Sequence, residues 1–193
     1  RQRQMCIRDR YIIDEAIVKK YLGNEKYLPS KNTINKAGVV NAMSYTMYGG
    51  DILKIEVGYY KGNNNIITTG SLGEVFIEST RIALSYIKSN YKKLNIDEEL
   101  LEKSDIHIHV PEGAVRKDGP SAGIAITTAI ISAFTNIKIK NNISMTGEIT
   151  LQGEILPVGG LKEKIIGAKN AGVTKIYLPS VSYTHLRAHE TSQ

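Results

Sequence analysis

The stretch DIHIHVPEGAVRKDGPSAGIAITTAIISAF, residues 105–134, contains the signals of a strand, a loop and a helix in succession. Polar and apolar residues alternate from Asp105 to Val110, which predicts a half-buried β-strand. The polar residues 111–120 follow, with a proline at each end, and predict a loop. Small and apolar residues over 121–134 predict a helix. This order places a serine at the start of a helix, directly after a glycine and a proline.

The residues before this stretch are rich in strand signals. Two β-rich runs joined by Gly49-Gly50-Asp51 predict a hairpin, and a third short strand follows an Asn-rich turn. Apolar residues at helical spacing then predict a long helix that ends near Asn90. The strands are expected at Val39–Tyr48, Ile52–Tyr60 and Ile66–Thr69, the long helix at 75–90, a short helix ending at Gly23 over 11–22, and a polar linker over 25–36.

The residues after this stretch alternate between strands and a helix. Short strands around 143–147 and 153–158 precede a helix over 160–171, and a last strand covers 173–178. Strands grouped early and βα units later predict an α+β fold, with mixed sheets and packed helices in a single domain.

The two ends differ in composition from the middle. RQRQMCIRDR and YTHLRAHETSQ have no helix or strand period, and both resemble translated sequencing-adapter sequence. We therefore expect non-native tails at 1–10 and 181–193, and we exclude their residues, including Cys6, from the chemistry. The alternative is that both ends are exposed native termini, in which case their residues would also carry no chemistry. Residues 11–36 are expected to precede one folded domain over 37–180.

Composition and charge exclude several classes of function. The first ten residues contribute +3 to the net charge of +6, and the other charges are of both signs and interspersed, so we expect no nucleic-acid partner. The longest apolar stretch, Ile124–Phe134, is too short to cross a bilayer. A single cysteine excludes a disulfide framework. No basic-then-apolar leader opens the chain, so we expect a protein that is not secreted.

The loop before the predicted helix ends in Gly119-Pro120-Ser121-Ala122-Gly123. Gly119 permits an unusual backbone angle, and Pro120 fixes the entry to the helix. Ser121 would lie where unpaired N–H groups favour an oxyanion, which suits a nucleophile. A helix N-cap is the alternative role for this serine. The G-x-S-x-G pattern of α/β-hydrolases does not apply, because they need a histidine after the serine and only the C-terminal tail has one.

A serine without a downstream histidine needs another base, and lysine is the known substitute. In the last predicted helix, apolar residues such as Leu161 and Ile165 share one side. Lys164 lies at the edge of that side, whereas Lys162 lies on the other side. Burial disfavours the charged form of lysine, so Lys164 could act as a neutral base. The alternative is a lysine whose stem packs while its ammonium reaches water.

Several long motifs resemble one family. DIHIHVPEGA, KDGPSAG and TGEITLQGEILPVGGLKEK, with YTMYGGDILKIEV and TGSLGEVFIES, are similar to the proteolytic domain of the ATP-dependent Lon proteases, in the bacterial and organellar branch. The resemblance extends from about Tyr11 to Ser180 and implies the Lon proteolytic-domain fold. The family domain continues for a strand and a helix beyond Pro179, so this domain is expected to be C-terminally incomplete. Val115 and Arg116 depart mildly from the family pattern.

The resemblance implies a Ser–Lys dyad, with Ser121 as the nucleophile and Lys164 as the general base. It also implies that the Thr146 hydroxyl helps to hold the lysine amine, and that Asp118 and Gly119 belong to a supporting loop. From the residues alone, Thr146 could equally be an ordinary strand residue and Asp118 a turn residue. The two histidines of the motif at 105–110 have no clear third ligand, and we interpret them as structural.

The implied activity is that of a serine endopeptidase, which would degrade unfolded or damaged proteins through an acyl-enzyme. No metal or cofactor is expected here. ATP and Mg²⁺ would belong to an ATPase module, whose last helix resembles residues 11–22, because no G-x-x-x-x-G-K-[ST] motif occurs in this chain. The implied partners are unfolded polypeptides and further copies in a hexamer, in the cytoplasm and without a membrane. The alternatives are a stand-alone ATP-independent peptidase and a non-catalytic scaffold domain.

Overall fold

Two compact units, residues 1–30 and residues 31–193, make up the chain. The computed structural model describes residues 14–23, 35–46, 49–111 and 113–180. In the first unit, helix α1 (Glu15–Leu22) begins at Asp14, whose carboxylate accepts the Ile17 N–H at 2.8 Å, and ends at Gly23 with φ 80°. The expected end of this helix is thereby confirmed. Both predicted tails and most of the linker lie outside the described residues, and the boundaries between the four predicted segments stay a prediction.

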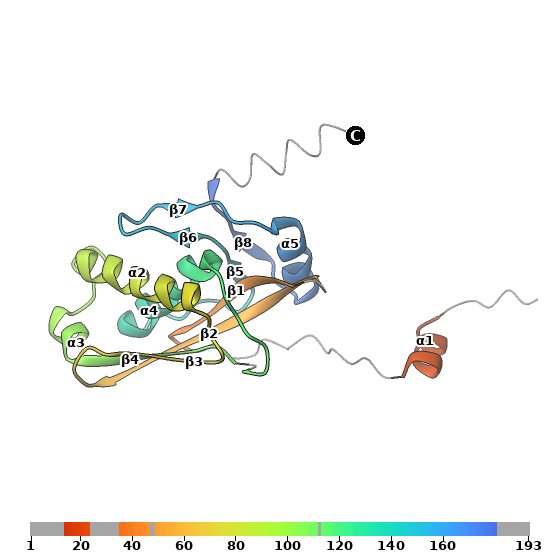
Figure 1. Ribbon diagram of the computed structural model, residues 1–193, viewed down its shortest axis with the longest axis horizontal. Coiled ribbons are helices and arrows are strands. Elements are labelled where there is room, and N and C mark those ends of the chain that lie inside the picture. The colour runs from red at the N-terminus through yellow and green to blue at the C-terminus, as the bar shows by residue number, and fades with distance from the viewer. Residues whose placement is uncertain (1–13, 24–34, 47–48, 112, 181–193) are drawn as a thin grey trace, which may run out of the picture. The chain divides into compact units, whose positions relative to one another are not determined.

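A six-stranded mixed sheet, in the order β3-β4-β2-β1-β5-β8, forms the centre of the second unit (Figure 1). The pairs β1–β2 and β2–β4 are antiparallel, whereas β1–β5, β5–β8 and β3–β4 are parallel. Antiparallel early strands and later parallel connections confirm the predicted mixed architecture. The bounds are β1 (Val39–Thr46), β2 (Gly49–Lys61), β3 (Ile66–Thr69), β4 (Ser104–His109), β5 (Ile143–Met145) and β8 (Lys175–Tyr177).

Alternation along the strands directs the large apolar side chains to one face of the sheet. In β4, Ile106 and Ile108 are at most 1% exposed, while the two histidines are only partly buried. Each buried isoleucine side chain contributes roughly 1.5–3 kcal/mol to folding. The alternation predicted from residues 105–110 is thereby confirmed.

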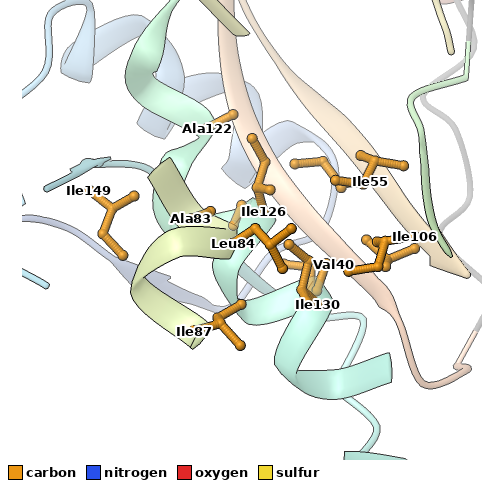
Figure 2. Close-up of a cluster of buried hydrophobic side chains, with 14 of the residues drawn as sticks. Val40, Ile55, Ala83, Leu84, Ile87, Ile106, Ala122, Ile126, Ile130 and Ile149 are labelled. Atoms are coloured by element: carbon orange, nitrogen blue, oxygen red, sulfur yellow. The ribbon is translucent and has the colours of Figure 1, made fainter. Parts of the chain in front are cut away.

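Helices α2 (Glu74–Asn90) and α4 (Gly123–Thr135) pack together over this apolar face (Figure 1). Figure 2 shows Ile126 and Ile130 of α4 among side chains from the sheet and from α2. Because α4 lies between the sheet and α2, it is buried on most of its sides, which explains why its sequence is almost uniformly small and apolar. A short helix not predicted from the sequence, α3 (Glu98–Glu102), follows α2.

The chain after β5 forms a small separate sheet and then helix α5. Strands β6 (Glu148–Ile149) and β7 (Ile155–Leu156) pair only with each other. Helix α5 (Leu161–Asn170) then leads to the last strand, within the predicted bounds of 160–171. It packs on β2 and β1.

The structure corrects one prediction, the turn at Gly49-Gly50-Asp51. All three residues belong to β2, and the ladder already pairs Gly49 with Thr46. The hairpin exists, but its connection is Met47-Tyr48, which lies outside the described residues. Gly50 and Ile55 are five residues apart, so their Cβ positions lie on opposite faces of the strand. A Cβ on Gly50 would meet the main chain of α5, so this helix packs opposite α2 and α4.

Candidate active site

The loop before Ser121 is attached to the segment that connects β3 to α2. The Lys117 N–H donates to the Ser71 carbonyl at 3.0 Å, and the Lys117 carbonyl accepts the Gly73 N–H at 2.8 Å. The buried Lys117 ammonium donates to the Gly70 carbonyl at 3.2 Å. The spacing of the sequence did not indicate that Lys117 would be buried. These bonds join the KDGPSAG motif to the TGSLGE motif, which begins 48 residues earlier in the sequence.

Asp118 joins the same loop to the start of α2. This helix begins at Gly73 without a side-chain cap of its own, and the Asp118 Oδ1 accepts the Phe76 N–H at 3.2 Å. The same oxygen accepts the Gly119 N–H at 2.9 Å, as in a turn. A Cβ on Gly73 would stand 2.1 Å from the Asp118 carboxyl, so only glycine leaves room for it. The carboxylate is therefore both a turn residue and a distant cap of α2.

Ser121 lies inside a single 3-10 turn, Pro120–Ala122, that leads into α4. Gly119 enters this turn with φ 119°, a value that favours glycine, and Pro120 is its first residue. Neither the turn nor α4 has a side-chain cap, so the alternative role of Ser121 as an N-cap is wrong. Ser121 is partly exposed.

The main chain of Ser121 is tied to the residues that follow β5. Its carbonyl accepts the Gly147 N–H at 2.9 Å, and the Gly147 carbonyl accepts the Ile124 N–H at 3.1 Å. A Cβ on Gly123 would stand 2.8 Å from the Ile149 nitrogen, so the start of α4 packs directly on β6. These contacts place Ser121 beside Thr146, the first residue after β5.

Lys164 and Thr146 meet in the interior. Lys164 is 4% exposed and Thr146 is 1% exposed. The Lys164 Nζ donates to the Thr146 Oγ1 at 3.3 Å, and the Thr146 hydroxyl donates to the Ser121 carbonyl at 3.1 Å. Burial away from water lowers the pKa of Lys164, because the charged form loses its hydration. The periodicity argument that turned Lys164 inward and Lys162 outward is confirmed, and the snorkelling alternative is wrong.

The two histidines of β4 share one partner. The Thr69 Oγ1 lies 2.9 Å from the His107 Nε2 and 2.7 Å from the His109 Nδ1. A hydroxyl carries a single proton, so at most one ring accepts from Thr69 and at least one ring donates its N–H to it. Among the described residues, no group of three His, Cys, Asp or Glu side chains could hold a metal ion. Within these ranges, no helix is both long and apolar enough to cross a membrane.

An apolar hollow of about 590 Å³ adjoins the site at Thr146. Its walls come from α4, β5, the end of β8 and the residues that follow it, including Ile124, Met145 and Tyr177. Neither Ser121 nor Lys164 lines it. The hollow and the hydrogen-bonded site are therefore neighbours that share one threonine.

Comparisons with known proteins match this chain to one family. Residues 12–190 match the family described as Lon protease (S16) C-terminal proteolytic domain. The chain is 51% identical over 174 residues to the Lon protease of Dictyoglomus thermophilum, 50% identical over 173 residues to that of Aster yellows witches'-broom phytoplasma, and 50% identical over 175 residues to that of Bacillus thuringiensis. These alignments cover 89–90% of this chain but 22% of each relative, so the chain spans about a fifth of their length.

The three named relatives are all Lon proteases, and the matching family is one of proteolytic domains. The chain belongs to the Lon protease (S16) C-terminal proteolytic domain family, as the resemblance of its motifs predicted.

Proposed function

We propose that this domain is a serine endopeptidase in which Ser121 is the nucleophile and Lys164 is the general base. The observation that carries the proposal is the buried series of hydrogen bonds from the Lys164 amine through the Thr146 hydroxyl to the main chain of Ser121. A lysine with a lowered pKa supplies a neutral amine near neutral pH, and only a neutral amine can accept a proton.

The reaction follows from these roles. The Ser121 Oγ bonds to the carbonyl carbon of a peptide, its proton passes to the Lys164 Nζ, and the carbonyl oxygen becomes an oxyanion. The intermediate collapses, the C–N bond breaks, and the Lys164 ammonium returns the proton to the leaving amine. Water then attacks the acyl-enzyme, with Lys164 again as the base, and releases the acid and the Ser121 hydroxyl. The overall reaction consumes only the peptide and water, so no metal or cofactor is needed.

Main-chain groups around Ser121 suit the oxyanion. The 3-10 turn at Pro120–Ala122 directly precedes α4, so the main-chain N–H groups of Ser121 and Ala122 lie at the positive end of the helix dipole. Gly119, with φ 119°, gives the chain the direction from which it enters this turn. Asp118 and Gly119 thereby act as supporting residues that hold the loop in shape, and Thr146 holds the amine.

The role of the whole protein is a further part of the proposal. The named relatives are Lon proteases of which this chain spans 22%, so we propose that the domain is part of a longer ATP-dependent protease. ATP and Mg²⁺ would be used by a separate ATPase module, and unfolded polypeptides would be the substrates. The protein would act in the cytoplasm as a homo-oligomer, by resemblance a hexamer. The scaffold alternative is weaker, because both Ser121 and Lys164 are present and lie on adjoining segments.

A covalent label tests the catalytic assignment. The 193-residue chain is incubated with a serine-directed peptidyl inhibitor, and intact mass followed by peptide mapping locates the adduct. We expect an adduct on Ser121 in the parent and in the control Lys162→Ala, and none in Lys164→Ala. Circular dichroism establishes that each variant is folded. A folded parent chain that forms no adduct would refute the assignment.

A further inference from the structure

The main chains of β2 and α5 are in direct contact at Gly50 and Gly167. A Cβ on Gly50 would stand 1.9 Å from the Glu163 carbonyl oxygen and 2.8 Å from the Lys164 nitrogen. A Cβ on Gly167 would stand 2.2 Å from the carbonyl group of Gly50. All of these obstacles are main-chain atoms, which cannot turn aside as the end of a side chain can. The two glycines therefore determine how closely α5 packs on the strand.

This contact lies on the turn of α5 that carries the buried lysine. Gly50 adjoins the main chain of Glu163 and Lys164, and Gly167 follows Lys164 by three residues, on the same side of the helix. Neither glycine has a positive φ. Glycine is therefore needed here for space and not for backbone conformation. A role in spacing also explains why Gly50 lies within a strand where the sequence predicted a turn.

We propose that Gly50 is a positioning residue for Lys164, with Gly167 as its partner on α5. The inference rests on the proposed function. A methyl group at Gly50 would force the strand and the helix apart by about 1.5 to 2 Å, the gap between 1.9 Å and an ordinary van der Waals contact. Lys164 would move with its helix, away from Thr146 and toward water. A misplacement of this size at a reacting group lowers a rate by up to about 100-fold.

The same strand offers a matched control. Gly58 lies eight residues after Gly50 on β2, so both Cβ positions are on one face of the strand. A Cβ on Gly58 meets no atom within 4 Å. Gly58→Ala thus adds the same methyl group to the same strand without pressing on α5. The change in strand propensity is equal in the two variants, and only the contact with α5 differs.

The test compares the parent chain, Gly50→Ala and Gly58→Ala. Carbon-13 NMR of labelled lysine follows the titration of the Lys164 amine, whose resonance is identified by its loss in Lys164→Met. Intact mass follows the rate of Ser121 labelling by the peptidyl inhibitor. We expect Gly50→Ala to raise the pKa of Lys164 toward its ordinary value, because water reaches the amine, and to lower the labelling rate about 10- to 100-fold near neutral pH. Gly58→Ala should leave both unchanged.

A second variant, Gly167→Val, approaches the same contact from the helix. A folded Gly50→Ala or Gly167→Val variant with the lysine titration and labelling rate of the parent would overturn the proposal. If Gly50→Ala and Gly167→Val both unfold while Gly58→Ala stays folded, the proposal is also overturned. The contact would then be needed for the stability of the whole domain and not specifically for the position of Lys164. A parent chain without a Ser121 adduct would refute the proposed function, whereas the NMR titration would still decide the positioning role.

Discussion

The Lys164 amine donates to the Thr146 hydroxyl at 3.3 Å, and both side chains are almost fully buried. The single proton of this hydroxyl is directed at the Ser121 carbonyl, 3.1 Å away. The Thr146 hydroxyl can therefore only accept a hydrogen bond from the Lys164 amine, whether the amine is neutral or charged. The lone pair of a neutral Lys164 amine is not used by Thr146 and remains available for a proton. Thr146 therefore orients the Lys164 amine and leaves its lone pair available to accept a proton.

Removal of the Thr146 hydroxyl should impair labelling of Ser121. Thr146→Val keeps the shape of the side chain but leaves the Ser121 carbonyl and the Lys164 amine without this partner. An unmade buried hydrogen bond costs about 1–3 kcal/mol, which corresponds to a rate about 5- to 150-fold lower. Inhibitor labelling followed by intact mass measures the rate. Thr146→Ser keeps the hydroxyl and should stay close to the parent; equal loss in both variants would contradict this role.

The labelling rate of Ser121 should rise with pH and reach its plateau below the ordinary pKa of lysine. Burial lowers the pKa of Lys164, and only its neutral form accepts the serine proton. The midpoint of the rate profile therefore reports the lowered pKa of Lys164 and not the ordinary pKa of an exposed lysine. Rates measured from pH 6 to about pH 10 test this. A midpoint at the value of an exposed lysine would show that the amine is solvated in solution.

Replacement of Lys164 by an apolar side chain should stabilise the domain at neutral pH. Because the folded-state pKa of Lys164 is lowered, the unfolded chain binds a proton that the folded chain lacks between the two pKa values, so stability rises with pH across that window. Below the folded-state pKa, the folded chain must bury a charge. Lys164→Met removes this penalty, and we expect a gain of about 1 kcal/mol in the free energy of unfolding.

Denaturant unfolding at several pH values checks this sign. The gain in Lys164→Met should shrink as the pH rises through the ordinary pKa of lysine, because the parent then loses its penalty. Lys162 is exposed on the same helix, so Lys162→Met should show no such dependence. If the increase in the free energy of unfolding of Lys164→Met is the same at every pH, it comes from packing and not from removal of a buried charge.

The sequence predicted those parts of the site that depend on local periodicity. The alternation at 105–110 predicted the strand, and the helical spacing around Lys164 predicted that it turns inward, because each pattern repeats within one element. The turn at Gly49-Gly50-Asp51 was predicted wrongly for a physical reason. Two glycines suit a turn and a close helix contact equally, and only the position of α5 distinguishes the two.

Contacts between distant segments could not be predicted from local patterns. The Asp118 carboxylate accepts the N–H of Phe76, 42 residues away in the sequence, and so caps α2. The ammonium of the buried Lys117 donates to the carbonyl of Gly70. Both partners are main-chain groups, which leave no mark in the amino-acid sequence. The uncapped start of α2 at Gly73 was the one available signal, since a helix without a local cap needs a partner from elsewhere.

The cap from Asp118 should couple the loop of Ser121 to α2. Asp118→Ala removes the acceptor of the Phe76 and Gly119 N–H groups and should lower stability by about 1 kcal/mol, the usual value of an N-cap. Because the loop is released near Ser121, the labelling rate should also fall. Asp118→Asn retains an oxygen acceptor and should recover most of both quantities. Arg116→Ala removes only the exposed ion pair with Asp118, at 3.7 Å, and should change little. Labelling that falls in Asp118→Ala and Asp118→Asn alike would show that the carboxylate charge, and not the cap, is required.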